Sequence, residues 1–235
     1  MFYFYGDKMK LSNRLQACAD LVQRGNVAAD VGTDHGYLAI HLLEEGICPH
    51  VYASDLREGP LTAARRSAAR TAVADRITFC LSDGLQNLPV SELGTVICAG
   101  MGADTIISIL EAAPQVRDPA VQLILQPQSR VHALRRYLGE SGFSILQERL
   151  SRDGKFLYTA LDVRFGGGHA FSPGEQFFPR VLRESGDPLL PDYQDRVIRG
   201  LRQSIDGLRR ARVPDLPLLH YYETALNELS EEAQT

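Results

Sequence analysis

The sequence predicts an α/β fold, with a mostly parallel seven-stranded sheet covered by helices on both faces and a C-terminal α-helical hairpin. Three observations lead to this prediction. Short apolar segments alternate with helical patterns from residue 11 to residue 141, as expected for a parallel sheet. Two longer apolar segments then follow one another and predict an antiparallel pair of strands. Two stripes of apolar residues at helical spacing come last.

The elements are expected in the following order. Residues 11–24 place apolar side chains at helical spacing and predict the first helix. Strands are expected at residues 26–31, 50–55, 76–83, 95–100 and 121–126, and helices at residues 37–45, 60–71, 103–113 and 131–141. Residues 142–150 and 155–165 predict two paired strands around a hairpin loop at residues 151–154.

A glycine-rich segment, GGGHAFSPG, follows the last predicted strand and indicates a domain boundary. We therefore expect one domain at residues 1–165 and a helical one at residues 172–235. In the second domain an amphipathic stripe consists of Tyr193, Val197, Leu201, Ile205 and Leu208. After the turn RVPDLP a second stripe spans residues 218–229, so two antiparallel helices packed as a hairpin are the simplest solution.

Composition narrows the class of protein. With 44% apolar and 23% charged residues the chain is expected to be globular, and no apolar run is long enough to cross a bilayer. The opening MFYFYG lacks the basic start and cleavage site of a signal peptide, and Met9 is an alternative start. The four cysteines are widely spaced without a CxxC pair, which predicts buried free thiols in a cytoplasmic protein rather than a zinc site or disulfides.

The turn after the first strand, Asp30-Val-Gly32-Thr33-Asp34-His35-Gly36, has the glycines of a ligand-binding turn but not the G-x-G-x-x-G spacing of dinucleotide sites. Gly32 permits close backbone approach to a ligand. Asp34 would repel a pyrophosphate. The charge instead favours a cofactor with a cationic amino group and a sulfonium, such as S-adenosyl-L-methionine.

The next two strands add acids in the same relative place. Asp55 ends the second strand, where a carboxylate can accept hydrogen bonds from ribose hydroxyls, and Asp83 ends the third, where it can accept one from an adenine amino group. Ligands bind along this carboxyl edge in open α/β sheets. The alternative is that the three aspartates only cap helices.

The fourth strand ends in Ala99-Gly100-Met101-Gly102. Many methyltransferases that act on exocyclic amines carry a polar-Pro-Pro-aromatic tetrad here, and this segment cannot hold an amine in that way. The glycines leave space for a flat group and Met101 offers a polarizable wall, which favours a ring nitrogen as target. The alternative is a plain strand-to-helix turn.

Five segments together, LSNRLQACADLV, ADVGTDHGYL, ASDLREGPL, ICAGMGADTIISIL and LILQPQ, resemble the bacterial tRNA (adenine-22 N1)-methyltransferases, the TrmK family, over residues 11–164. The resemblance implies a Rossmann-like class I methyltransferase domain, a C-terminal helical hairpin of coiled-coil type, and methyl transfer from S-adenosyl-L-methionine to N1 of adenine 22 in tRNA. The predicted cofactor contacts are Asp30, Gly32, Thr33, Asp34, Gly36, Asp55, Leu56, Asp83, Gly84, Ala99, Gly100 and Met101.

The resemblance also places residues around the target base. Asp34, His35 and Tyr37 are the predicted catalytic group at the pocket mouth, which Arg14 could also face. Arg14, Gln126 and Gln128 are predicted RNA contacts. Gln126-Pro127-Gln128 stands where the family usually has Gln-Pro-Asn, and this departure bears on the reach of Gln128 toward the substrate. Asp55 stands where the family usually has Glu, a change without consequence for ribose binding.

Adenine N1 lies on the Watson–Crick edge, so the base must be presented unpaired. Catalysis would then be mainly positioning. Asp34 would stabilise the developing positive charge or accept the N6 proton, unless it only contacts the cofactor amino group or caps a helix. His35 and Tyr37 would stack on the base or position it. A metal role for His35 is not indicated, because the sequence has no second ligand near it at a usable spacing.

The charge distribution suggests where RNA would bind. The net charge is −4, but residues 180–212 hold eight arginines against five acids. Arg199 and Arg202 are the predicted contacts to the tRNA backbone; a solvated helix face or a dimer seam is the alternative. We expect a monomer or weak homodimer. A methyltransferase for a small molecule or protein, and a non-catalytic RNA-binding module, remain the alternative functions.

Overall fold

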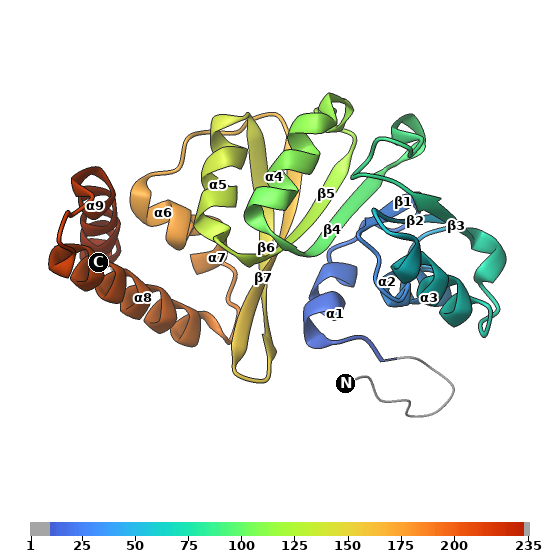
Figure 1. The fold of residues 1–235 in the computed structure, drawn as a ribbon, viewed down its shortest axis with the longest axis horizontal. Helices are drawn as coiled ribbons and strands as arrows, with labels where there is room; N and C mark the ends of the chain where they lie inside the picture. The colour runs from blue at the N-terminus through green and yellow to red at the C-terminus, as the bar shows by residue number, and fades with distance from the viewer. Residues whose placement is uncertain (1–9, 233–235) are drawn as a thin grey trace.

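The computed structural model of the chain describes residues 10–232. The expectations about a signal peptide and about Met9 as a start lie outside the described residues. Figure 1 shows one wound sheet flanked by helices, with a pair of long helices at one end of the molecule.

The elements follow the predicted alternation. In chain order they are α1 Asn13–Ala19, β1 Ala28–Val31, α2 Tyr37–Glu44, β2 Val51–Asp55, α3 Glu58–Ala68, the 3-10 turn η1 Ala74–Arg76, β3 Ile77–Leu81, η2 Val90–Glu92, β4 Thr95–Gly102, α4 Ala103–Ala112, η3 Pro114–Val116, β5 Gln122–Ser129, α5 Val131–Glu140, β6 Phe143–Asp153, β7 Phe156–Phe165, α6 Pro173–Phe177, α7 Arg180–Arg183, α8 Leu190–Arg210 and α9 Leu216–Glu232. The first helix is shorter than predicted, because Leu21 and Val22 donate to carbonyls three residues back and continue in tight turns.

The strands form one seven-stranded sheet in the order β3-β2-β1-β4-β5-β7-β6. Strands β1 to β5 pair in parallel, and β7 runs antiparallel to both of its neighbours. The predicted mostly parallel sheet is confirmed. The chain crosses from β3 at one edge to β4 in the middle, so the direction of winding reverses between β1 and β4, the usual place for a ligand site.

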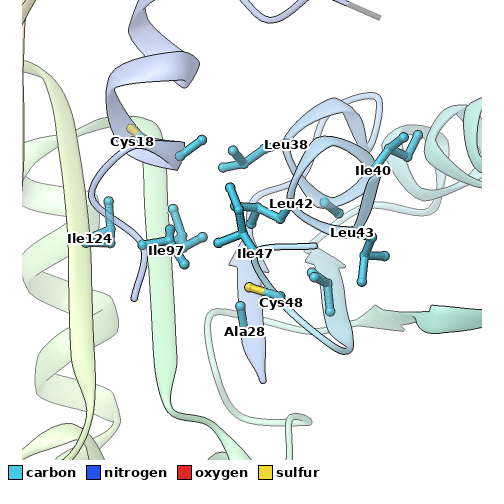
Figure 2. Close-up of a cluster of buried hydrophobic side chains, with 14 of the residues drawn as sticks. Cys18, Ala28, Leu38, Ile40, Leu42, Leu43, Ile47, Cys48, Ile97 and Ile124 are labelled. Atoms are coloured by element: carbon cyan, nitrogen blue, oxygen red, sulfur yellow. The ribbon is translucent and has the colours of Figure 1, made fainter. Parts of the chain in front are cut away.

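Each face of the sheet is covered by apolar side chains, because successive strand residues point to opposite faces. Ala28 and Ile97 face the cluster that α1 and α2 cover, which Figure 2 shows, whereas Ala29 and Val96 face the cluster under α4 and α5. All four cysteines are free thiols. Cys80 is only partly buried and in this respect departs from the prediction.

The hairpin of β6 and β7 has a tighter turn than predicted. Residues 151–153 belong to β6, and Asp153 pairs with Phe156, so only Gly154 and Lys155 form the turn. Gly154 has φ +59°, a conformation that lets a two-residue turn join two strands directly. Because β7 runs antiparallel to β5, the tip of this hairpin lies beyond the carboxyl ends of the parallel strands, between α1 and the start of α8 (Figure 1).

The C-terminal helices pack on that hairpin. Helix α8 buries Tyr193, Leu201 and Ile205 of the predicted stripe. These helices share a third apolar cluster with Leu150 and Leu157 of the hairpin. The segment before α8 contains two short helices, α6 and α7. The division into domains at residues 165 and 172 stays a prediction.

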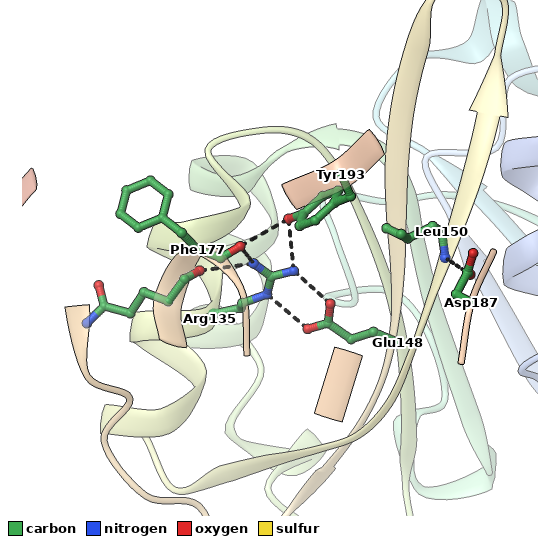
Figure 3. Close-up of polar contacts among 7 residues, drawn as sticks. Arg135, Glu148, Leu150, Phe177, Asp187 and Tyr193 are labelled. Atoms are coloured by element: carbon green, nitrogen blue, oxygen red, sulfur yellow. Dashed lines mark hydrogen bonds and ion pairs between the residues drawn. The ribbon is translucent and has the colours of Figure 1, made fainter. Parts of the chain in front are cut away.

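A buried ion pair joins the sheet to the C-terminal helices (Figure 3). Arg135 on α5 donates from Nε and Nη2 to the two carboxylate oxygens of Glu148 on β6, at 2.9 and 2.7 Å, and both side chains are fully buried. Arg135 also donates to the Phe177 carbonyl oxygen and to the Tyr193 hydroxyl. Burial is the largest single effect and lowers the pKa of Arg135, but the charge of Glu148, Tyr193 and the hydrogen bonds to both together raise the pKa above its usual value, so the guanidinium stays charged.

Candidate functional site

The parallel strands bring the predicted acids to one edge of the sheet. Asp30 lies in β1, Asp55 ends β2, and Asp83 follows β3. None of the three is the N-cap residue of α2 or α3, whose N-caps are Gly36 and Arg57. Asp55 does accept a hydrogen bond from the Arg57 backbone N at 2.8 Å, which turns the chain into α3.

A large hollow of about 910 Å³ opens along this edge beside β1, β2 and β4. The side chains of Asp55, Leu56 and Asp83 line it, together with the Gly84 backbone. Leu56 is 66% exposed, so an apolar side chain lies uncovered next to two carboxylates. An acid pair beside exposed apolar surface suits a nucleoside, whose ribose and base need hydrogen-bond acceptors and a flat apolar wall.

A small hollow of about 90 Å³ adjoins the large one, and both are lined by Gly32 and Ala99. It contains Asp30, which is 6% exposed. Burial raises the pKa of the Asp30 carboxyl to about 6, with the Thr33 side chain as an opposing contribution and the charge of Asp55 as a smaller one in the same direction as burial. Thr33 Oγ1 in the same hollow is buried and has no hydrogen-bond partner among the described residues. A buried carboxylate beside a buried hydroxyl fits an ammonium-bearing amino acid group.

Met101 marks the boundary between the two hollows. A Cβ added at Gly32 would lie 2.3 Å from Met101 Cε, so the thioether rests directly on the glycine. Gly32 has φ +75° and therefore also has a backbone conformation that favours glycine. Any ligand that spans both hollows passes at this point.

The predicted catalytic residues meet at the mouth of the small hollow. The His35 and Tyr37 rings stack on one another, with centroids 5.2 Å apart and planes 15° apart. His35 Nε2 lies 3.7 Å from Asp34 Oδ2, and the Asp34 side chain is 84% exposed. Asp34 is therefore available to a group that enters from solvent.

Arg14 also lines the small hollow, and it is fixed by the sheet. Its Nη1 donates to Gln126 Oε1 at 2.8 Å, and the same oxygen accepts from the Gly100 backbone N at 3.1 Å. Gln126 is fully buried and its Nε2 donates to the Pro127 carbonyl oxygen, so its polar atoms are occupied within the protein. Of the predicted RNA contacts, Gln126 thus acts on a ligand only through Arg14.

Sequence reasoning missed Asp153. From the tip of the β6–β7 hairpin its two carboxylate oxygens accept from the backbone N of Asn13 and of Arg14, at 3.2 and 3.3 Å. The Asn13 side chain in turn donates to the Arg152 carbonyl oxygen at 2.7 Å. The hairpin tip therefore binds the first turn of α1 and sets the position of Arg14; nothing local in the sequence signals a contact across such a separation.

The remaining predicted residues, Gly36, Gln128, Arg199 and Arg202, do not line either hollow. Gly36 lines neither hollow and instead allows α2 and α3 to approach, since a Cβ there would lie 3.1 Å from that of Ala64. Gln128 is exposed at the end of β5, and its Nε2 lies 3.5 Å from the place of a Cβ at Gly100. Arg199 and Arg202 are exposed on α8, outside both hollows.

Two negative findings concern residues 10–232. No group of three His, Cys, Asp or Glu side chains there is arranged to hold a metal ion. In the same range no helix combines the length and the apolar character required for a membrane span.

Comparison with known proteins gives a consistent result. Residues 11–161 match the family model described as a methyltransferase domain. The chain is 31% identical over 198 residues to the tRNA (adenine(22)-N(1))-methyltransferase of Bacillus subtilis, an alignment that covers 81% of this chain and 83% of that one.

Among solved structures, the Streptococcus pneumoniae protein Sp1610 in complex with S-adenosyl-L-methionine is similar with a TM-score of 0.76 and 26% identity, covering 94% of this chain and 99% of that one. The Bacillus subtilis m1A22 tRNA methyltransferase TrmK shares the fold with a TM-score of 0.77 at 24% identity, covering 97% of both chains.

Proposed function

The chain belongs to the methyltransferase-domain family and, within it, to the tRNA (adenine(22)-N(1))-methyltransferases, and on that premise we propose that it methylates N1 of adenine 22 in tRNA with S-adenosyl-L-methionine as methyl donor. One observation carries this proposal besides the family. Acidic side chains lie at the carboxyl ends of three neighbouring strands and line two adjoining hollows, one of a size for a nucleoside and one with a buried carboxylate.

The residues present fit the cofactor. Asp55 and Asp83 would hold the ribose and adenine in the large hollow, and Asp30 and Thr33 the amino acid end in the small one. The thioether of Met101 would then lie beside the sulfonium, at the boundary of the hollows. When bound, the cofactor supplies an electrophilic methyl group.

The side chains of the mouth would present the target base. N1 would take the methyl group with its lone pair and the C–S bonding pair would stay with sulfur, so the adenine ring would carry the positive charge. The exposed Asp34 carboxylate would stabilise that charge or accept the proton from N6. The stacked His35 and Tyr37 rings offer a flat surface on which an unpaired base can rest.

Arginines would bind the RNA backbone. Arg14 is held at the mouth by Gln126, and Arg199 and Arg202 project from the exposed side of α8. Guanidinium groups on a protein of net negative charge are useful for RNA binding only where they cluster, and α8 provides such a cluster. With tRNA as partner we propose a cytoplasmic location, and a monomer or weak homodimer.

The proposal is tested by methyl transfer from labelled S-adenosyl-L-methionine to bulk tRNA lacking the modification, compared with transfer to a metabolite extract and to protein. We expect label in tRNA, and none in a tRNA whose adenine 22 is replaced by guanine. Label in the metabolite or protein fraction alone would support the alternative of a small-molecule or protein methyltransferase. Cofactor binding without any transfer would indicate a non-catalytic RNA-binding module.

A further inference from the structure

A third hollow lies outside the site described so far. We call it the interhelical groove: about 280 Å³ between the end of β5, the start of α5, β7 and the two C-terminal helices. Gln128 and Ser129 line one end of it, and Val197, Gly200 and Ser204 of α8 line one wall. The family assignment and the cofactor hollows leave this groove unexplained.

The walls of the groove are aromatic. The ring of His132 stacks on that of Phe177, with centroids 4.5 Å apart and planes 14° apart, and Tyr158 and Tyr222 line the same space. Burial, with the charge of Arg130 as a smaller contribution, lowers the pKa of His132 to about 4, so this ring is neutral near pH 7. Neutral, partly exposed rings beside hydroxyl and amide groups suit a nucleobase, which needs stacking and a few hydrogen bonds.

The charge of the groove is opposite to that of the protein as a whole. The chain carries 29 acids against 25 Lys and Arg, yet no Asp or Glu lines the groove, whereas Arg130 and Arg196 do. Arg130 is paired with Asp104 at 2.7 Å. Arg196 donates to the Leu157 carbonyl oxygen and forms no ion pair within residues 10–232, so its positive charge is not neutralised by a carboxylate. A phosphate is the group this charge would attract.

One side chain, Gln128, links the groove to the large hollow. Gln128 belongs to the lining of the groove, and the same side chain approaches Gly100, which lines the large hollow. The path that the RNA chain would take therefore runs past Gln128, from the large hollow into the groove. Gln128 is exposed, so its side chain is open to contact with that chain.

From these observations we infer that the interhelical groove binds one unpaired nucleotide of the substrate RNA, next to the methylated adenine. Its base stacks among Tyr158, His132 and Tyr222, and its phosphate lies by Arg196. This inference rests on the proposed function and extends it, since it makes the C-terminal helices part of a base-binding site and not only of a backbone-binding surface.

The groove can be blocked by a large side chain in place of Gly200. Gly200 lines the groove, and a Cβ built there has no atom within 4 Å, so a large side chain can fill the space without displacing the helix. Gly207, two turns further along α8, has equally open surroundings but does not line the groove. Gly200→Trp is therefore the blocking variant and Gly207→Trp the matched control. Ser204→Trp, also on the groove wall, blocks it independently.

We would measure tRNA affinity by fluorescence anisotropy with S-adenosylhomocysteine present, cofactor affinity by calorimetry, and thermal stability for all three variants. Gly200→Trp and Ser204→Trp are expected to weaken tRNA binding about tenfold or more, the value of one lost stacking contact. Cofactor affinity and stability should stay at the wild-type level, and Gly207→Trp should bind tRNA within about twofold of wild type. Equal tRNA affinity in all variants would overturn the inference that the groove binds a nucleotide. Equal weakening of tRNA binding by both glycine replacements would overturn it as well.

A second measurement separates the groove from the proposed reaction. A short single-stranded oligoribonucleotide is titrated into the wild-type protein while the His132 ring protons are followed by NMR. Shifts at His132 that disappear in Gly200→Trp are expected whether or not methyl transfer takes place. Methyl transfer to tRNA without shifts of the His132 signals would overturn only the inference about the groove. Shifts of the His132 signals without methyl transfer would overturn only the proposed function.

Discussion

Lowering the pH should weaken cofactor binding, and Asp30 is the cause that the structure identifies. The carboxyl is almost completely buried in the small hollow, and burial, with the charge of Asp55 as a further cause, raises its pKa to about 6. It is ionised at about pH 7.5 and mostly protonated at about pH 5. The ammonium group of the ligand then loses its carboxylate partner.

The size of the effect follows from that pKa. If only the ionised form binds, affinity falls by the ratio of ionised fractions, about tenfold between pH 7.5 and pH 5. Calorimetric titration with S-adenosylhomocysteine at constant ionic strength measures it, because this ligand keeps the amino group but lacks the sulfonium. Asp30→Asn should bind weakly at both pH values and lose the pH dependence. Asp83→Asn, at the nucleoside end, should bind the ligand weakly but keep the pH dependence of the affinity.

Stability without ligand should change in the opposite sense. The folded pKa of Asp30 lies above its usual 3.8, so the folded chain binds more protons between about pH 4 and 6. Its contribution to the free energy of unfolding is therefore lost as pH rises through this window, by at most about 3 kcal/mol, and Asp30→Asn should remove that slope in urea unfolding. Affinity that stays constant between the two pH values, or an unchanged pH dependence in Asp30→Asn, would refute this account of the small hollow.

Three further outcomes are expected. Replacing Glu148 by Leu leaves its arginine partner charged and buried, so urea unfolding should show a loss of about 3–5 kcal/mol, mostly recovered when Arg135 is changed to Met as well; a loss below about 1 kcal/mol would contradict the role of the ion pair. Charge reversal of Arg199 and Arg202 should weaken tRNA binding and reduce its salt slope by about 2 while cofactor affinity stays constant, and unchanged tRNA affinity would remove them from the RNA surface. Gln126→Leu should lower kcat/KM for tRNA about 10- to 100-fold, since the arginine it holds loses its acceptor, and should cost about 1–3 kcal/mol of stability because the Gly100 backbone N loses the same acceptor; kinetics like those of wild type would show that this contact is not needed.

The fold was predictable because its signals are local. Each strand–helix pair carries its own periodicity, and the acids at the carboxyl ends of β1, β2 and β3 can be assigned to one edge as soon as the strands are parallel. The turn between β6 and β7 was placed too widely, because Gly154 permits a two-residue connection that the apolar pattern does not reveal.

The contacts that complete the site were not predictable in this way. Asp153 reaches the N-terminus of α1, and Glu148 pairs with Arg135, through tertiary arrangement alone. A charged residue in an amphipathic strand is expected in solvent, so the burial of Glu148 gives no sign in the sequence. The interhelical groove was missed for the same reason, since its walls come from six elements spread over residues 127–222.

The contact between Asp153 and Arg14 determines when, during synthesis, the substrate site is completed. The two residues are 139 positions apart, so during translation α1 emerges long before the carboxylate that positions it. A nascent chain can form β1 to β5 and their helices, yet its Arg14 lacks this support until the last two strands have left the ribosome and paired. Substrate can then be recognised fully only by chains in which β6 and β7 have been made and have paired.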